Sequence, residues 1–100
     1  MYRRLQLCSN HGGYEAIPEP PGSLDLRAVR EVLEREGIPV IDARVMLIAS
    51  LEPEVTISRA GRLLFKTHDA RAAERAFDRL RELLGLPGME TEPSSRTPGG

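Results

Sequence analysis

Two amphipathic helical segments, each bounded by residues that start and stop helices, most constrain the fold of this chain. The first is predicted over residues 26–36 and the second over 70–84, because Asp25 and Asp69 are favourable N-caps and a glycine and then a proline follow each segment. Each segment carries an apolar stripe at helical spacing, so each must pack its stripe against another element. The stripes are Leu26, Val29, Val32 and Leu33 in the first segment, and Ala73, Phe77, Leu80 and Leu84 in the second.

Four segments outside the helices have the pattern of β-strands. Residues 2–8 alternate polar and apolar side chains, which predicts a strand with one solvated face. Residues 45–51 are almost wholly apolar, as in a central strand that is covered on both sides. Residues 55–58 and 62–67 flank a short turn in which Gly61 supplies a positive φ, so we expect a β-hairpin there.

The order of these elements predicts an α+β fold, β-α-β-β-β-α, in which a curved antiparallel sheet carries two helices on one face. The other face is then open or covered by a partner. Residues 9–23 are rich in glycine and proline and are predicted to form a loop. Residues 1–86 are expected to form a single domain, and residues 87–100, which lack an apolar pattern, a disordered tail.

Composition excludes several functional classes. Lysine and arginine number 14 against 15 aspartates and glutamates, so no global field draws the chain to nucleic acid or to an anionic membrane. Cys8 is the only cysteine, which rules out an internal disulfide. No segment approaches the roughly 20 apolar residues of a membrane span. We therefore expect a cytoplasmic protein without membrane contact. No glycine-rich nucleotide motif is present, so no cofactor is predicted.

Cys8 and His11 form a Cys-x-x-His pair at the end of the first predicted strand. A closed zinc site needs four ligands, and the chain has one cysteine and two histidines, so no metal site is predicted. The amides of a glycine-rich loop beside Cys8 would lower the pKa of its thiol. A thiol-dependent enzyme built on Cys8 is therefore kept as an alternative to a non-catalytic protein.

Polar residues of the first and last predicted strands suggest a second alternative. Arg4, Gln6, Arg62 and Lys66 are expected on the open face of the sheet, where basic side chains contact a nucleic-acid backbone. In this hypothesis two copies of the chain form a homodimer and bind nucleic acid across the open face.

Several stretches resemble the C-terminal module of ThiF/MoeB/HesA-type adenylyltransferases, which activate sulfur-carrier and ubiquitin-like proteins. The stretches that carry the resemblance are Leu7-Cys8, residues 23–29 through Glu36-Gly37, residues 54–57, Ala60-Gly61-Arg62-Leu63-Leu64, and residues 69–73. Ala60 stands where that family has aspartate, and the family's ATP-binding loop and zinc cysteines are absent. The resemblance implies a non-catalytic binding or accessory module whose protein partner belongs to a sulfur-carrier activating system.

The same region is similar to one repeat of the TATA-box-binding protein fold. Leu24-Asp25-Leu26, Glu52-Pro53 and Gly61-Arg62, together with the long last helix, carry this resemblance. Two such repeats form a saddle whose open sheet grips the DNA minor groove. The resemblance implies the same half-saddle fold here and a homodimer that would rebuild the saddle.

Overall fold

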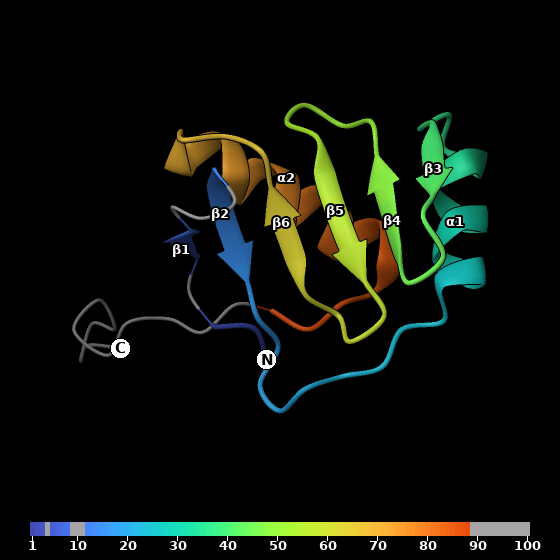
Figure 1. Ribbon diagram of the computed structural model, residues 1–100, viewed down its shortest axis with the longest axis horizontal. Coiled ribbons are helices and arrows are strands. Elements are labelled where there is room, and N and C mark those ends of the chain that lie inside the picture. The colour runs from blue at the N-terminus through green and yellow to red at the C-terminus, as the bar shows by residue number, and fades with distance from the viewer. Residues whose placement is uncertain (4, 9–11, 89–100) are drawn as a thin grey trace.

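The computed structural model describes residues 1–3, 5–8 and 12–88, apart from the side chain of Cys8. Their elements follow one another as β1 (Gln6–Cys8), β2 (Gly13–Ala16), α1 (Leu26–Arg35), β3 (Val40–Asp42), β4 (Met46–Ala49), β5 (Val55–Ser58), β6 (Leu63–Phe65) and α2 (Ala70–Leu84) (Figure 1).

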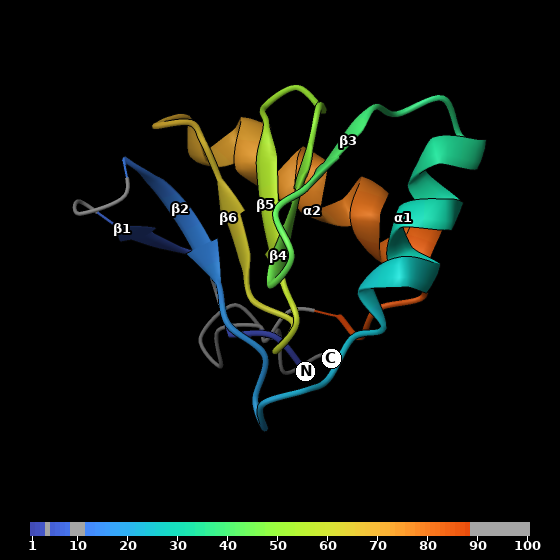
Figure 2. The ribbon, with the colours of Figure 1, turned by 45° about the vertical axis from the view of Figure 1, so that its right-hand side comes forward.

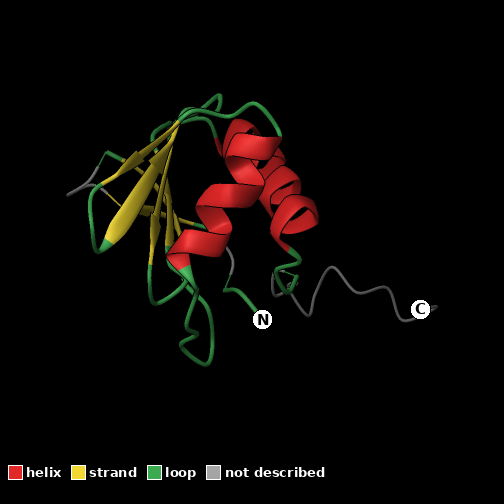
Figure 3. Ribbon diagram, turned by 90° about the vertical axis from the view of Figure 1, so that its right-hand side faces the viewer, coloured by secondary structure: helices red, strands yellow, loops and turns green. Residues whose placement is uncertain are grey.

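The strands form one sheet in the order β1-β2-β6-β5-β4-β3, and every neighbouring pair is antiparallel. Both helices lie on the same side of this sheet (Figure 3). The predicted α+β class, the antiparallel sheet and the placement of the two helices are therefore confirmed. The described chain adds two strands to the predicted order, β2 and β3.

Strand β2 lies within the segment that was predicted to be a loop. It pairs with β1 on one side and with β6 on the other, with Tyr14 opposite Phe65. A side chain at Gly13 would overlap the carbonyl oxygen of Phe65, so only glycine allows this close approach of the two strands. The prolines of the segment begin at Pro18, after the strand has ended, and so they leave its pairing intact.

Both helices begin and end as their sequences indicate. The carboxylate of Asp25 accepts hydrogen bonds from the amides of the second and third residues after it, and Asp69 does the same for α2. Gly85 ends α2 in the left-handed conformation with a φ of 68°. The local signals therefore suffice to define where each helix lies.

The core lies between the helices and the sheet. In α2 the buried stripe includes Ala76 as well as the predicted Ala73, Phe77 and Leu80, whereas Leu84 is only half-buried. The buried apolar residues are Tyr2, Ala16, Val29, Leu33, Ile38, Leu47, Ala49, Val55, Ile57, Leu63, Phe65, Ala73, Ala76, Phe77, Leu80 and Leu86. Neither described helix is long and apolar enough to cross a membrane.

Strand β4 differs from the expectation for the apolar segment at 45–51. Its burial alternates, with Leu47 and Ala49 buried under the helices and Met46 and Ile48 only half-buried on the other face. Val45 lies in the turn before the strand and is 59% exposed. The described chain therefore covers this segment on one face only, and its other face belongs to the open side of the sheet.

The two ends of the described chain meet beside the sheet. The amide of Tyr2 donates a hydrogen bond of 2.9 Å to the carbonyl oxygen of Gly88, and Leu86 is buried. Pro87 and Gly88, the first two residues of the predicted tail, thus belong to the described structure. Residues 89–100 lie outside it.

Candidate functional site

The open face of the sheet presents a continuous row of side chains across all six strands. Cross-strand partners point to the same face of an antiparallel sheet, so the register defines the row from edge to edge. Figure 1 looks onto this face, with α2 behind the strands. The row consists of Ile41, Ile48, Thr56, Leu64, Glu15 and Gln6.

One half of this face is aliphatic. Ile41 in the edge strand β3 is 60% exposed, and its partner Ile48 and the more distant Leu64 are half-buried. Met46 lies two residues before Ile48 in β4, on the same face and opposite Ser58, and widens the apolar area. We call Ile41, Met46, Ile48 and Leu64 the aliphatic row. No described helix covers it (Figure 3), which is unusual for branched apolar side chains on a monomer.

The other half of the face carries a paired charge. A guanidinium nitrogen of Arg62 donates to a carboxylate oxygen of Glu15 on the neighbouring strand β2. The side chain of Glu15 is 15% exposed, whereas that of Arg62 is 52% exposed. The amide of Arg62 also donates to Oγ of Ser58 at 3.0 Å, which holds its backbone in the hairpin. The positive charge of Arg62 is thus balanced on this face.

The structure brings together part of the predicted binding site. Gln6 lies opposite Glu15 in the β1–β2 ladder, so Gln6 and Arg62 both neighbour this glutamate. Lys66 is exposed one residue beyond β6, where its amide donates to the carbonyl oxygen of Glu54. Sequence reasoning missed Glu15, because its segment was expected to be a loop rather than a strand beside β6.

The remaining predicted site residues have no described side chain. Arg4 and His11 lie outside the described residues, and Cys8 is described only by its backbone in β1, opposite Gly13. Among the described side chains, no group of three or more histidine, cysteine, aspartate or glutamate residues lies close enough to hold a metal ion. The thiol hypothesis for Cys8 stays a prediction.

A second feature is a cavity of about 560 Å³ at the edge of the sheet where α1 begins. In Figures 1 and 2 the start of α1 and the β3–β4 and β5–β6 turns all lie at the lower edge of the molecule. The cavity is lined by Leu24, Asp25, Leu26, Arg27, Arg30, Asp42, Arg44, Leu47 and Arg59. No sequence pattern marked this set, because its members come from three separate segments, 24–30, 42–47 and 59.

Backbone hydrogen bonds fix the walls of this cavity relative to one another. The amide of Leu24 donates to the carbonyl oxygen of Arg59 at 2.7 Å, and that of Gly22 to Ala60 at 3.2 Å. The segment that leads into α1 is therefore tied to the β5–β6 turn. This pairing places Arg59 beside the first turn of α1, which contains Arg27, although the two arginines are 32 residues apart in the chain.

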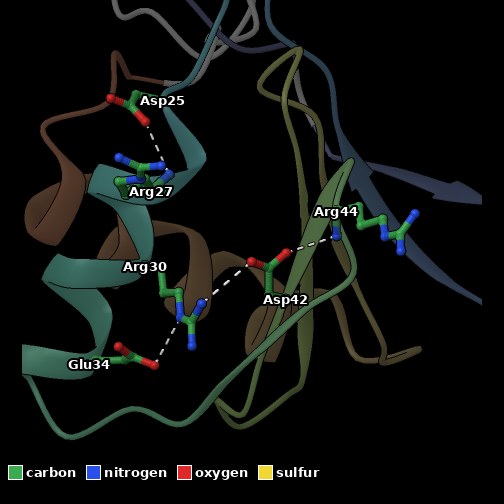
Figure 4. Close-up of polar contacts among 6 residues, drawn as sticks. All are labelled: Asp25, Arg27, Arg30, Glu34, Asp42 and Arg44. Carbon is green, nitrogen blue, oxygen red and sulfur yellow. Dashed lines mark hydrogen bonds and ion pairs between the residues drawn. The ribbon is translucent and has the colours of Figure 1, made fainter.

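Asp42 organises the opposite wall. Its carboxylate accepts from a guanidinium nitrogen of Arg30 at 3.4 Å and from the amide of Arg44 at 2.8 Å (Figure 4). Arg44 has a left-handed φ of 73°, an uncommon conformation for a residue other than glycine, and the bond to Asp42 supports it. Arg30 also pairs with Glu34 at 3.1 Å, so its guanidinium is held from two sides.

The chain was compared with protein-family models, with curated proteins and with solved structures, and nothing matches it in any of the three.

Proposed function

We propose that this protein is a non-catalytic binding module that works as a homodimer, with two copies joined through the open faces of their sheets. The observation that carries the proposal is the uncovered aliphatic row. Ile41 exposes 60% of its surface, and the helices of its own chain lie on the other side of the sheet. A second copy would bury this row, and each buried aliphatic side chain contributes about 1.5–3 kcal/mol when it is removed fully from water.

The charge of the face supports a second copy of the chain as the occupant. Arg62 is neutralised by Glu15, so this ion pair adds no net charge to the face beside the aliphatic row. A neutral, aliphatic surface is complementary to another of the same kind. A twofold axis brings identical patches together, so the same face on two copies can satisfy both.

The same features argue against nucleic acid as the occupant of this face. A nucleic-acid surface needs unbalanced positive charge and gains affinity from aromatic side chains on which bases stack. The row presents aliphatic, hydroxyl and amide groups and a paired charge, and no aromatic residue. The binding of nucleic acid by Arg4, Gln6, Arg62 and Lys66 stays a prediction.

The finer part of the proposal concerns the setting in which the module works. The resemblance to the C-terminal module of ThiF/MoeB/HesA-type adenylyltransferases suggests an accessory role beside a sulfur-carrier activating system. The single Cys8 suggests a cytoplasmic protein. Both suggestions rest on sequence patterns alone.

The mass of the protein in solution tests the homodimer. Light scattering behind size-exclusion chromatography should give twice the 11.1 kDa of the chain for the wild type and 11.1 kDa for Ile41→Glu. Leu7→Glu is the matched control, because Leu7 lies in the other edge strand, is 56% exposed, and points to the opposite face by its register with Tyr14. This control should remain a dimer.

A monomeric wild type at all concentrations would overturn the proposal, and so would equal masses for the two variants. Salt-sensitive binding of an A·T-rich duplex that is lost in Arg62→Ala would favour the nucleic-acid alternative instead.

A further inference from the structure

The cavity at the start of α1 has a strongly positive lining. Four of its nine lining residues are arginines and two are aspartates, which leaves a formal charge of plus two. The chain as a whole carries a net charge of minus one, so this lining is a local concentration of positive charge. A hollow with walls of one sign focuses the field and attracts ions of the opposite sign.

The two carboxylates of the lining are already engaged within the protein. Asp25 accepts from the amides of Arg27 and Ala28 at 3.0 and 3.3 Å, and Asp42 accepts from Arg30 and from the Arg44 amide. The first-turn amides that bond to Asp25 are thereby used, so the helix N-terminus is not what would hold a ligand.

The guanidinium groups of Arg27 and Arg59 are the ones available to a ligand. Neither forms an ion pair or a side-chain hydrogen bond with another part of the described chain, including the partner Glu31 that the i,i+4 spacing provides for Arg27. Arg30 lies beside them but is held by Glu34 and Asp42 (Figure 4). The Arg44 side chain extends away from Arg30 and Asp42, and the amide of Arg44 is what bonds to Asp42 (Figure 4).

We propose that this cavity binds a small phosphate monoester, with Arg27 and Arg59 holding the phosphate group. A phosphate monoester carries a charge of about −1.5 to −2 at pH 7, which matches the formal charge of the lining, whereas a carboxylate would balance only half of it. Guanidinium groups bind phosphate through two parallel hydrogen bonds, and two arginines from different segments can grip it from two directions.

The size of the cavity and its apolar wall define the rest of the ligand. About 560 Å³ lies within the range of small-molecule sites, roughly 300–1,000 Å³, and exceeds the needs of a free phosphate ion. Leu24 and Leu26 line the cavity and are half-buried, so part of their side chains remains accessible. These leucines offer an apolar surface for a ring or a compact hydrocarbon body attached to the phosphate.

Titration with phenyl phosphate, followed by amide chemical shifts of the ¹⁵N-labelled protein, tests the proposal. Phenyl phosphate combines a dianionic phosphate with an apolar ring, whereas inorganic phosphate and phenol each supply one half of that chemistry. We expect saturable shifts centred on residues 24–30, 42–47 and 59–61, with weaker binding of inorganic phosphate and none of phenol.

Two variants assign the binding to the named side chains. Arg59→Ala and Arg27→Ala should each weaken phenyl phosphate by roughly tenfold or more, the loss expected for one charge-assisted contact. Both side chains are exposed, and alanine is a good helix former at position 27, so both variants should fold. Arg71→Ala on α2, outside the cavity, is the matched control and should bind like the wild type.

The proposal would be overturned if phenol produced the same shifts as phenyl phosphate, or if no probe gave saturable shifts. Equal affinities for Arg59→Ala, Arg27→Ala and Arg71→Ala would also overturn it. These outcomes are independent of the homodimer, because the cavity and the aliphatic row share no residue.

Discussion

Removal of a single hydroxyl group, in Tyr2→Phe, tests how the N-terminus is joined to the rest of the fold. The Tyr2 side chain is 2% exposed, and its hydroxyl donates a hydrogen bond of 2.6 Å to the carbonyl oxygen of Gly61 in the β5–β6 turn. Its ring meets Phe77 of α2 edge-on, with centroids 5.2 Å apart. Phenylalanine keeps the ring contact and loses only the hydrogen bond.

The expected loss follows from the burial of both partners. Gly61 is buried, so in Tyr2→Phe water cannot readily reach its carbonyl oxygen to replace the lost hydrogen bond. An unsatisfied buried group of this kind costs about 1–3 kcal/mol, and we expect the free energy of unfolding to fall by about 1–2 kcal/mol. In a domain of this size each kcal/mol lowers Tm by roughly 4–8 °C.

The pH dependence of this loss identifies its source. Burial raises the pKa of the Tyr2 hydroxyl, because the phenolate is poorly solvated in the core. Because the pKa of Tyr2 is higher in the folded than in the unfolded chain, its contribution to the free energy of unfolding is fully present below the unfolded-state pKa of about 10. This contribution is lost as the pH rises through the folded-state pKa. The difference in stability between wild type and Tyr2→Phe should therefore be constant near neutral pH and shrink above about pH 10.

Urea unfolding followed by circular dichroism measures both effects, and the m-value should stay unchanged. Tyr14→Phe is the matched control, since Tyr14 is half-buried and its hydroxyl forms no hydrogen bond with the described residues. Its effect should remain within about 0.5 kcal/mol. If Tyr2→Phe were no more destabilising than Tyr14→Phe, the bond to Gly61 would not be stabilising the fold.

Two further substitutions test other parts of the structure. Gly61→Ala should lower Tm more than Gly37→Ala. Both glycines have a positive φ, which costs about 1–2 kcal/mol for other residues. Only at Gly61 would the new Cβ also press on the Pro18 ring, at 3.3 Å. Equal losses in thermal scans would show that the turn relaxes. Arg3→Ala should raise the pKa of Glu19, which the hydrogen bond and the charge of Arg3 lower in the wild type. The lowered pKa means that the Arg3–Glu19 pair stabilises the fold at pH values above the unfolded-state pKa of Glu19, and that this stabilisation is lost as the pH falls through the folded-state pKa. If the Glu19 pKa measured by NMR were the same in Arg3→Ala as in the wild type, the pairing would be refuted.

Features decided within a few residues could be predicted from the sequence. Asp25 and Asp69 cap helices through amides only two and three positions away, and Gly61 makes a turn between strands that are neighbours in the chain. The apolar stripes of both helices follow from the helical period alone. For these reasons the α+β class and the two-layer arrangement were already evident in the order of the residues.

Strands β2 and β3 were missed because both are short, and β2 also because one of its two pairings is with a distant segment. Each has only three or four residues, too few for a periodic signal, and β2 pairs with β6 about fifty positions later. The sequence also left open what covers β4. A run of apolar residues shows that a strand is hydrophobic on both faces, but it does not show whether a helix lies over each face.

The two candidate sites divide in the same way. The sequence by itself determined that Gln6 and Arg62 would lie on the open face, since strand alternation sets which way a side chain points. Only the tertiary structure placed Glu15 beside Arg62, and only the pairing of the Leu24 segment with the β5–β6 turn brought Arg59 to Arg27. Contacts of this kind depend on where whole elements pack, and no short-range pattern in the chain encodes them.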